Sequence, residues 1–401
     1  MAADANSLPL YPELAWRWVE KALDNEYQHL LSDEGKKELK EIDKYWAKLS
    51  VHGMERNLVP PEYKIFTGYT PVSVFSYTWD MVLPNYEKIL KVGLKAIIKE
   101  AQDRLKEIAK DTDLDAREYL SQKRFLEAAI ISLQATIDFA KRYAKLAREK
   151  AATEKRPDEK KRLEKLAEIC DWVPENPART MHEAMQCYFF IHLIVGFIEL
   201  PSVGCGIRLD KVMYPYYKKD LDEGRITKAE ALNLVESVWI KFEEMGFIHP
   251  PRLFGSAGGG LAWQNVTIGG VDADGKDASN DLSYMILEAT KELHSVQPPL
   301  CFRYHDKIPR ALVLKAIETL RTGVAQPAFF NDKMMVPYLL EKGMPLADAR
   351  DYAISNCMSW VIPGKAMVYR QGMGMFSFTN CMMLALNQGV DWLSGQKARR
   401  C

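Results

Sequence analysis

The sequence predicts an α/β protein whose first half is mainly helical. Long stretches with apolar residues at helical spacing fill the first 170 residues. After Cys170, short runs rich in β-branched and aromatic residues alternate with helical segments, a pattern typical of α/β folds. The chain has 401 residues, of which 47% are hydrophobic and 27% charged. This composition excludes a mainly disordered or collagen-like chain.

Four amphipathic helices are expected in the first half of the chain. They span residues 13–31, 32–49, 86–110 and 115–153, and Ser32 with Glu34 marks the start of the second. Between the second and third helices lies a break rich in proline and glycine. The highly charged segment 154–165 is predicted to be a solvated connection between helices.

The second half is expected to alternate between helices and strands. Thr180 with Glu183, and Thr227 with Glu230, have the spacing of capping boxes at the starts of helices 181–197 and 227–242. Between these helices, residues 204–210 are predicted to be a loop that precedes an aromatic patch at 214–217. Further helices are expected at 281–293, 309–322 and 334–342, and strands at 265–271, 299–304 and 325–330.

Charge and cysteine usage exclude several classes of function. The chain has 54 Lys and Arg against 54 Asp and Glu, which gives no electrostatic attraction to nucleic acid or to an anionic membrane. The longest apolar stretch, 188–203, contains His192 and Glu199 and is too short to span a bilayer. The N-terminus lacks the pattern of a secretory signal. Seven cysteines without a Cys-x-x-Cys pair argue against zinc and disulfide frameworks and favour a reducing cytoplasm.

Several glycine, histidine and aspartate residues are candidates for phosphate or metal sites. The triple glycine 258–260 lacks the lysine of a phosphate-binding loop and is interpreted as a mobile or close-approach loop. The histidines do not fall at metal-ligand spacing, so no metal site is expected. Asp272, Asp274 and Asp277 resemble a calcium loop without its closing glutamate, and a β-turn after a strand is the better interpretation.

Cys357 lies in a mostly apolar segment, 352–364, that ends in a Pro-Gly turn. The pattern predicts a strand that leads into a tight loop with the thiol at its tip. A thiolate would need a neighbouring histidine or helix N-terminus, and the local sequence offers neither. A structural cysteine is one interpretation. The other is thiyl radical chemistry, which requires the exclusion of water rather than a lowered pKa.

A series of motifs gives the chain a family resemblance over nearly its whole length. They occur in order at 173–179, 183–186, 206–210, 214–220, 264–270 and 326–332. Together they resemble the glycyl radical enzymes of the pyruvate formate-lyase-like superfamily. The resemblance implies a ten-stranded α/β barrel of two five-stranded halves, wrapped by helices, with Cys357 as the cysteine that becomes a thiyl radical. It also implies a glycyl radical installed by an activating enzyme that uses S-adenosylmethionine and an iron–sulfur cluster.

Two departures from the family pattern refine this expectation. No Arg-Val-x-Gly-Tyr radical motif occurs, so residues 1–401 are expected to be a truncated pyruvate formate-lyase-like domain, with a helical outer layer at 1–170 and a barrel portion at 171–401. Such a fragment is not expected to turn over by itself. Ser359 stands where dehydratases and several decarboxylases carry an acid–base glutamate, and Asn356 stands where pyruvate formate-lyase has a second cysteine.

The resemblance then favours the fumarate-adding benzylsuccinate and alkylsuccinate synthases. A glycyl radical decarboxylase, a formate-acetyltransferase-like lyase and an inactive homologue or scaffold remain as alternatives. Arg370 is the candidate clamp for a fumarate carboxylate, with a structural ion pair as its alternative. Met358, Trp360, Phe254 and Gly255 are candidates to line a hydrocarbon pocket, and core packing is an equal interpretation of Trp360. No cofactor is expected to bind this segment, whereas accessory subunits and a homodimer partner are possible.

Overall fold

A computed structural model describes residues 32–49, 72–73, 83–195, 205–244, 264–355, 359–365, 375–376, 378–390, 395 and 397. The contacts divide the chain into two compact units. The described residues from 83 to 365 belong to the first unit, and the others belong to the second. The predicted helix at 13–31 lies outside the described residues, and the proposed division of the chain at residue 170 stays a prediction.

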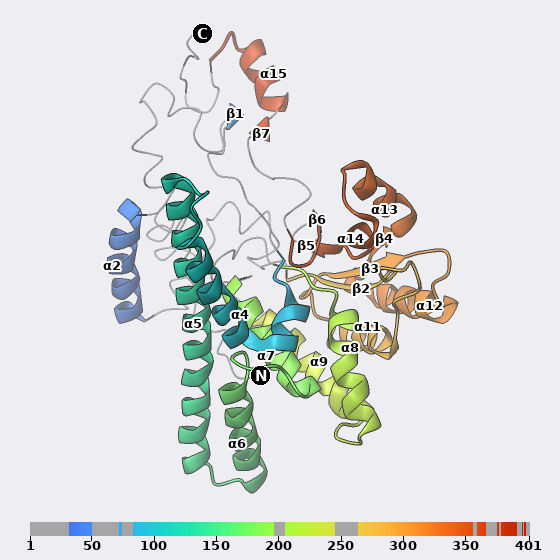
Figure 1. The fold of residues 1–401 in the computed structure, drawn as a ribbon. Coiled ribbons are helices and arrows are strands. Elements are labelled where there is room, and N and C mark those ends of the chain that lie inside the picture. Colours follow the sequence, from blue (N-terminus) through green and yellow to red (C-terminus); the bar gives the residue numbers. More distant parts are fainter. Residues whose placement is uncertain are drawn as a thin grey trace. The chain divides into compact units, whose positions relative to one another are not determined.

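Three helices form the N-terminal part of the first unit (Figure 1). These are α4 (Tyr86–Ile108), α5 (Ala116–Thr153) and α6 (Pro157–Trp172). Asn85 and Asp115 cap α4 and α5 by accepting backbone N–H groups three residues ahead. The prediction of a solvated connection at 154–165 is wrong beyond its first residues, because α6 begins at Pro157. One face of α6 is apolar and buried and includes Leu163 and Ile169, but the many charged residues around it obscure this helical pattern in the sequence.

Helix α7 (Met181–Leu193) is the centre of the core of this unit. Every residue described in it except His182 is buried, as expected of a helix that is apolar nearly all round. It packs against α4, α8 (Leu209–Asp222) and α9 (Lys228–Glu243). The capping box at Thr227 and Glu230 is confirmed. At Thr180 the predicted box forms only in part, because the Glu183 carboxylate accepts from the backbone and guanidinium of Arg179 instead.

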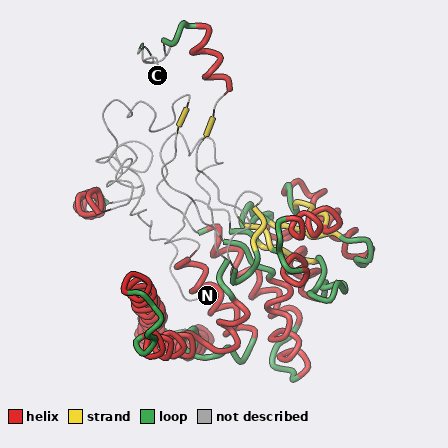
Figure 2. The backbone as a smooth tube through the Cα atoms, turned by 45° about the horizontal axis from the view of Figure 1, so that its top comes forward, coloured by secondary structure: helices red, strands yellow, loops and turns green. Residues whose placement is uncertain are grey.

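The sheet of this unit has three parallel strands in the order β2-β3-β4. They are β2 (Val266–Gly269), β3 (Leu300–Tyr304) and β4 (Ala328–Asn331), with Val266 opposite Leu300 and Cys301 opposite Ala328. Helix α11 (Asp281–Leu293) connects the first pair of strands. Helix α12 (Arg310–Thr319) and a π-turn (Leu320–Val324) connect the second. Figure 2 shows these strands beside the helices that connect them, which confirms the α/β class.

Of two loop predictions, the structure corrects one in part and confirms the other. The loop and aromatic patch at 204–217 are corrected in part: Arg208 forms a parallel bridge with Thr267 beside β2, and the aromatic residues belong to α8. The apolar periodicity of the patch was hidden by Pro215, which the structure places inside the helix. The turn predicted at 272–277 is confirmed, because Gly275 N donates to Asp272 O and Val271 pairs with Asp277.

The last described elements of the first unit carry the cysteine segment. Helices α13 (Asp332–Glu341) and α14 (Leu346–Arg350) lead to the antiparallel strands β5 (Ala353–Ser355) and β6 (Ser359–Val361). In the second unit, the described elements are α2 (Asp33–Leu49), α15 (Phe378–Leu386) and the paired strands β1 (Val72–Ser73) and β7 (Met375–Phe376). Ser32 caps α2 through Gly35 N, as predicted. No helix among the described residues combines the length and apolarity needed to cross a membrane.

A buried histidine lies in the core between α7 and the start of β2. His192 is fully buried, and its ring contacts the Tyr86 hydroxyl at 3.1 Å through Nδ1 and the Gln264 side-chain oxygen through Nε2. Since that oxygen can only accept, Nε2 carries the proton and Nδ1 accepts from the tyrosine. Burial lowers the pKa of His192 to about 4, and burial also lowers the pKa of His182 to about 4.

We expect acid to destabilise the protein through these histidines. The unfolded chain takes up a proton at His192 below about pH 6.5, whereas the folded chain does so only near pH 4. The free energy of unfolding therefore falls as the pH drops from about 6.5 to 4, by about 3 kcal/mol for His192 alone. Urea unfolding measured at pH 7 and pH 4.5 tests this. His192→Gln should reduce the pH dependence and exposed His294→Asn should not, and an equal slope in both would contradict it.

Candidate functional site

The candidate cysteine is carried by the hairpin of β5 and β6. Ser355 pairs with Ser359 across the hairpin, so three residues, of which Cys357 is the middle one, join the two strands. A strand leading into a tight loop was predicted here: the strand is confirmed as β5, β6 was not predicted, and the residues between them lie outside the described residues. Cys357 and Met358 themselves lie outside the described residues, as do Arg370, Phe254 and Gly255. Their predicted roles therefore stay predictions.

Trp360 is the one predicted pocket residue that the structure describes. It is half-buried in β6, and its ring lies 4.9 Å from that of Tyr338 on α13 in an edge-on arrangement. It packs against a small core cluster that includes Ile354 and Ile362. This contact agrees with the core-packing interpretation of Trp360 and leaves its role toward a substrate a prediction.

Ser359 lies at the start of β6 and is completely buried. Its hydroxyl has no acid–base function at neutral pH, so this position supplies neither a general base nor a general acid.

The hairpin ends at a turn where Gly364 has φ +71 and its N–H donates to Leu83 O. A Cβ at Gly364 would lie 2.7 Å from Asn85 Cβ, which explains the glycine in the predicted Pro-Gly turn.

A fully buried arginine holds the chain just before β5. Arg303, on β3, donates through Nε and a terminal nitrogen to the two carboxylate oxygens of Asp332, at 2.9 and 2.8 Å. It also donates to the backbone oxygens of Tyr352 and Arg350, at 2.9 and 2.8 Å. The Tyr352 ring stacks on the guanidinium at 3.8 Å, and its hydroxyl donates to Asp332 at 2.7 Å. We call Arg303, Asp332 and Tyr352 the hairpin-base cluster.

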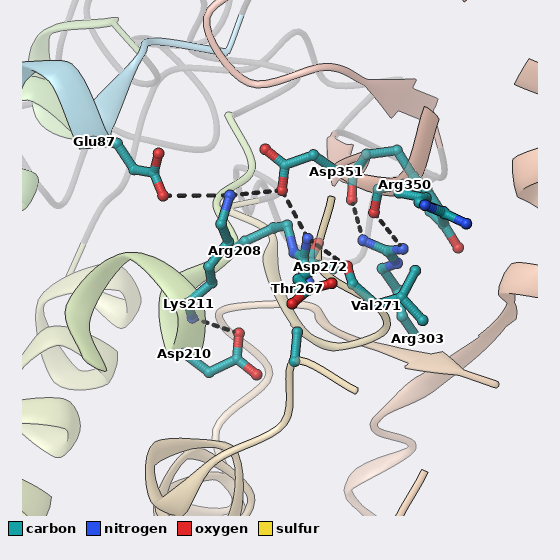
Figure 3. A network of polar contacts seen from close by, with 12 residues as sticks. Glu87, Arg208, Asp210, Lys211, Thr267, Val271, Asp272, Arg303, Arg350 and Asp351 are labelled. Atoms are coloured by element: carbon teal, nitrogen blue, oxygen red, sulfur yellow. Dashed lines mark hydrogen bonds and ion pairs between the residues drawn. The ribbon is translucent and has the colours of Figure 1, made fainter. Parts of the chain in front are cut away.

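A second buried arginine reaches the same segment from the bridge beside β2 (Figure 3). Arg208 donates to Asp351 at 2.7 Å and to the backbone oxygens of Val271 and Gly269 at 3.1 and 2.9 Å. Lys211 donates to the same Asp351 oxygen at 2.9 Å. Burial opposes the charged form of Asp351, but Arg208 and Lys211 outweigh it and lower the pKa of this carboxyl.

A glycine lets this bridge approach the hairpin closely. A Cβ at Gly206 would lie 1.8 Å from the backbone oxygen of Ile354 in β5. Next to this contact, Ile354 N donates to Thr267 Oγ1 at 3.0 Å. The glycine of the 206–210 motif is therefore required because two backbones meet there.

Gly206→Ala should force β5 away from the bridge and destabilise the protein by about 1–3 kcal/mol or more. Thermal unfolding followed by circular dichroism measures the effect. Gly343→Asn is the matched control, because nothing lies within 4 Å of a Cβ at Gly343 and asparagine tolerates its positive φ. Equal melting temperatures for Gly206→Ala and the parent protein would contradict the close approach.

The sequence indicated Arg208, Asp210 and Asp332 only as parts of the motifs that resemble the family. It did not indicate Arg303 or Tyr352 as site residues. An arginine inside the short apolar run 300–304 was the available signal, because a buried charge needs a partner. The partner, Asp332, directly follows the next strand, and the parallel register of the two strands brings it near Arg303. Within the described residues, no group of three His, Cys, Asp or Glu side chains could hold a metal ion.

Four of the described cysteines are poor candidates for thiolate chemistry. Cys170, Cys205 and Cys301 are buried, and burial raises the pKa of each thiol to about 12. Burial also raises the pKa of Cys187. Their thiols are therefore protonated at neutral pH, as expected for small apolar core residues.

Comparisons with known proteins agree with this architecture. The sequence profile described as pyruvate formate lyase-like matches residues 2–399. The chain belongs to the pyruvate formate lyase-like family, the superfamily of glycyl radical enzymes. It is 38% identical over 307 residues to isethionate sulfite-lyase from Nitratidesulfovibrio vulgaris, covering 76% of this chain and 37% of that protein.

Two dehydratases are similar over almost the whole chain. The (2S)-3-sulfopropanediol dehydratase of Klebsiella oxytoca is 30% identical, covering 99% of this chain and 49% of its own. The glycerol-bound structure of the B12-independent glycerol dehydratase from Clostridium butyricum superposes on this chain with a TM-score of 0.82 and 30% sequence identity. The match covers 97% of this chain and 49% of the dehydratase chain. This chain thus spans half or less of these relatives. They are dehydratases and a sulfite-lyase, not the fumarate-adding synthases that were expected.

Proposed function

We propose that this chain supplies the radical-carrying cysteine of a glycyl radical lyase, with Cys357 as the hydrogen-abstracting residue. The observation that carries the proposal is the short β5–β6 hairpin, whose three connecting residues centre on Cys357 in a chain of this family. The radical glycine of the family would generate the Cys357 thiyl radical when the segment that carries this glycine is combined with this chain.

The reaction at Cys357 needs no external oxidant, because the thiyl radical is regenerated in each cycle. The Cys357 thiyl takes a hydrogen atom from a substrate carbon, which forms an S–H bond and leaves a carbon radical. A substituent on the adjacent carbon then leaves with its bonding electrons, a neighbouring hydroxyl loses its proton, and the unpaired electron stays on the carbon skeleton. The product radical takes the hydrogen atom back from the S–H bond, which restores the thiyl.

The relatives favour such an elimination, since their names describe dehydratases and a sulfite-lyase. Ser359 limits how the elimination can be assisted, because an alcohol hydroxyl has no pKa near neutral pH and is a poor general acid or base. A proton acceptor for the substrate hydroxyl would have to come from another residue. We expect this chemistry to take place in the cytoplasm.

Addition of a hydrocarbon radical to fumarate is the second candidate. It is favoured by Ser359, because this reaction needs no acid–base residue beside the thiyl. In this case Arg370 would bind a fumarate carboxylate through two parallel N–H···O bonds, beside a pocket that includes Met358, Trp360, Phe254 and Gly255. An activating enzyme, and possible accessory subunits and a second copy of the chain, would be its partners.

Two assays on the activated protein separate these candidates. The chain is joined to a segment that carries the family's radical glycine and is activated anaerobically with an S-adenosylmethionine-dependent activating enzyme; we call the result the activated protein. Its organic radical is quantified by electron paramagnetic resonance. Release of sulfite or water from small hydroxy-sulfonates and diols is expected, without consumption of fumarate. Fumarate consumption with a hydrocarbon would favour the second candidate. Absence of any organic radical after activation would contradict both.

Arg370→Lys tests the second candidate at a single residue. Lysine keeps the charge and loses the planar fork, so fumarate binding should weaken by about 1.5–3 kcal/mol, or roughly 10- to 150-fold. Hydrocarbon affinity should change little, because an apolar pocket does not depend on this charge. The measurement is the apparent affinity for each substrate in the activated protein, and unchanged fumarate affinity would contradict a carboxylate clamp at Arg370.

A further inference from the structure

Polar residues from four separate parts of the chain meet at the base of the cysteine hairpin. They are, in order from the bridge, β2, β3 and the start of α13, Arg208, Thr267, Arg303 and Asp332. The first three donate to or accept from the segment 350–354, and Asp332 accepts from the Tyr352 hydroxyl within that segment. Figure 3 shows Arg208 and Arg303 converging on this segment from different strands.

The location resembles a ligand site but is filled by the chain itself. In open parallel sheets, ligands bind beyond the carboxyl ends of the strands. Here the backbone oxygens of Arg350 and Tyr352 occupy that place and accept from Arg303. Both carboxylate oxygens of Asp332 accept two further donors of the guanidinium. Four of the five N–H donors of Arg303 are thus used within the chain and the side chain is fully buried, so this arginine acts on the segment that leads into β5.

We propose that Arg303, Asp332 and Tyr352 are positioning residues that fix the base of the β5–β6 hairpin and thereby the place of Cys357. This inference rests on the proposed function for its catalytic consequence, but not for its structural one. Tyr352 directly precedes β5, and only five positions separate it from Cys357. Loosening the base therefore moves the reacting sulfur, and hydrogen transfer is steeply sensitive to such a displacement, since about 1 Å can cost about 100-fold in rate.

The structural consequence can be measured without radical or substrate. Tyr352→Phe removes only the hydroxyl that donates to Asp332, and Arg303→Lys keeps the charge but loses the fork. Amide hydrogen exchange by mass spectrometry should become about five- to tenfold faster in 353–361, while exchange in β2 stays unchanged. Tyr304→Phe and Arg310→Lys are the matched controls. The Tyr304 hydroxyl has no hydrogen-bond partner in the described part of the chain, and Arg310 is exposed at the start of α12.

Unchanged exchange in 353–361 for both variants would overturn the proposal. Equal acceleration in β2 and in the hairpin would overturn it as well, because that result indicates general loosening of the fold. Tyr352→Phe keeps the test informative if Arg303→Lys does not fold, since it changes a single oxygen atom.

The catalytic consequence is tested in the activated protein with the substrate that it turns over. Tyr352→Phe should lower kcat about tenfold with KM unchanged and should raise the substrate deuterium isotope effect, because hydrogen transfer becomes slower. A loss of folded protein alone would lower kcat without changing the isotope effect. Faster hairpin exchange with unchanged kcat and isotope effect would overturn the positioning role. If no substrate is turned over, the proposed function fails, and the exchange experiment still decides whether the cluster holds the hairpin.

Discussion

Cys357→Ala should reduce turnover in the activated protein to the level of the unactivated protein. Alanine has no S–H bond, so no hydrogen atom can be taken from the substrate or returned to the product. The glycyl radical itself is expected to form normally, because the cysteine is not its carrier. Turnover assays combined with electron paramagnetic resonance test both statements on the same sample.

The control for this experiment is Cys170→Ala, which removes a thiol buried in α6. It should keep turnover, with at most a modest loss of stability from the small cavity it creates. Residual activity near that of the parent protein in Cys357→Ala would mean that another cysteine carries the thiyl radical.

Asp332→Asn should be the most destabilising of the conservative substitutions in the hairpin-base cluster. It leaves the Arg303 guanidinium, which is fully buried, without a counter-charge. Breaking a buried ion pair by removing one partner costs about 3–5 kcal/mol, a large part of the usual 5–15 kcal/mol stability of a domain. The measurement is the free energy of unfolding from denaturant titration at neutral pH.

Asp306→Asn is the matched control for this substitution. Asp306 lies 3.7 Å from Lys333, and both side chains are more than two-thirds exposed. Removing one exposed partner should change the free energy of unfolding by less than about 1 kcal/mol. Similar losses for the two variants would show that burial of the Arg303–Asp332 pair does not set its contribution.

The helices were the most predictable part of the fold, because their signals are local. The predicted span 281–293 coincides with α11, and the predicted span 115–153 differs from α5 only at Asp115, which caps the helix. Helix α6 was missed since its surface is densely charged and only a narrow apolar stripe reveals it. Local periodicity and caps thus identify helices well where the exposed face does not dominate the composition.

The candidate site was predictable only at Cys357, and there through family resemblance. The hairpin-base cluster depends on contacts between distant parts of the chain: Arg208 and Asp351 are 143 positions apart, and Arg303 and Asp332 are 29 apart. Hydrophobic patterning indicates that a strand is buried but not which carboxylate faces an arginine within it. That pairing follows from the parallel register of β3 and β4.

We expect Cys357 to take a hydrogen atom from the substrate and to return it to the product. This transfer is tested, in ordinary water, with a substrate of the activated protein that carries deuterium at the carbon from which the hydrogen is taken. Mass spectrometry of the product should find the deuterium retained, at the carbon that lost its substituent. A product that instead contains hydrogen from the solvent at that carbon would contradict transfer through the cysteine.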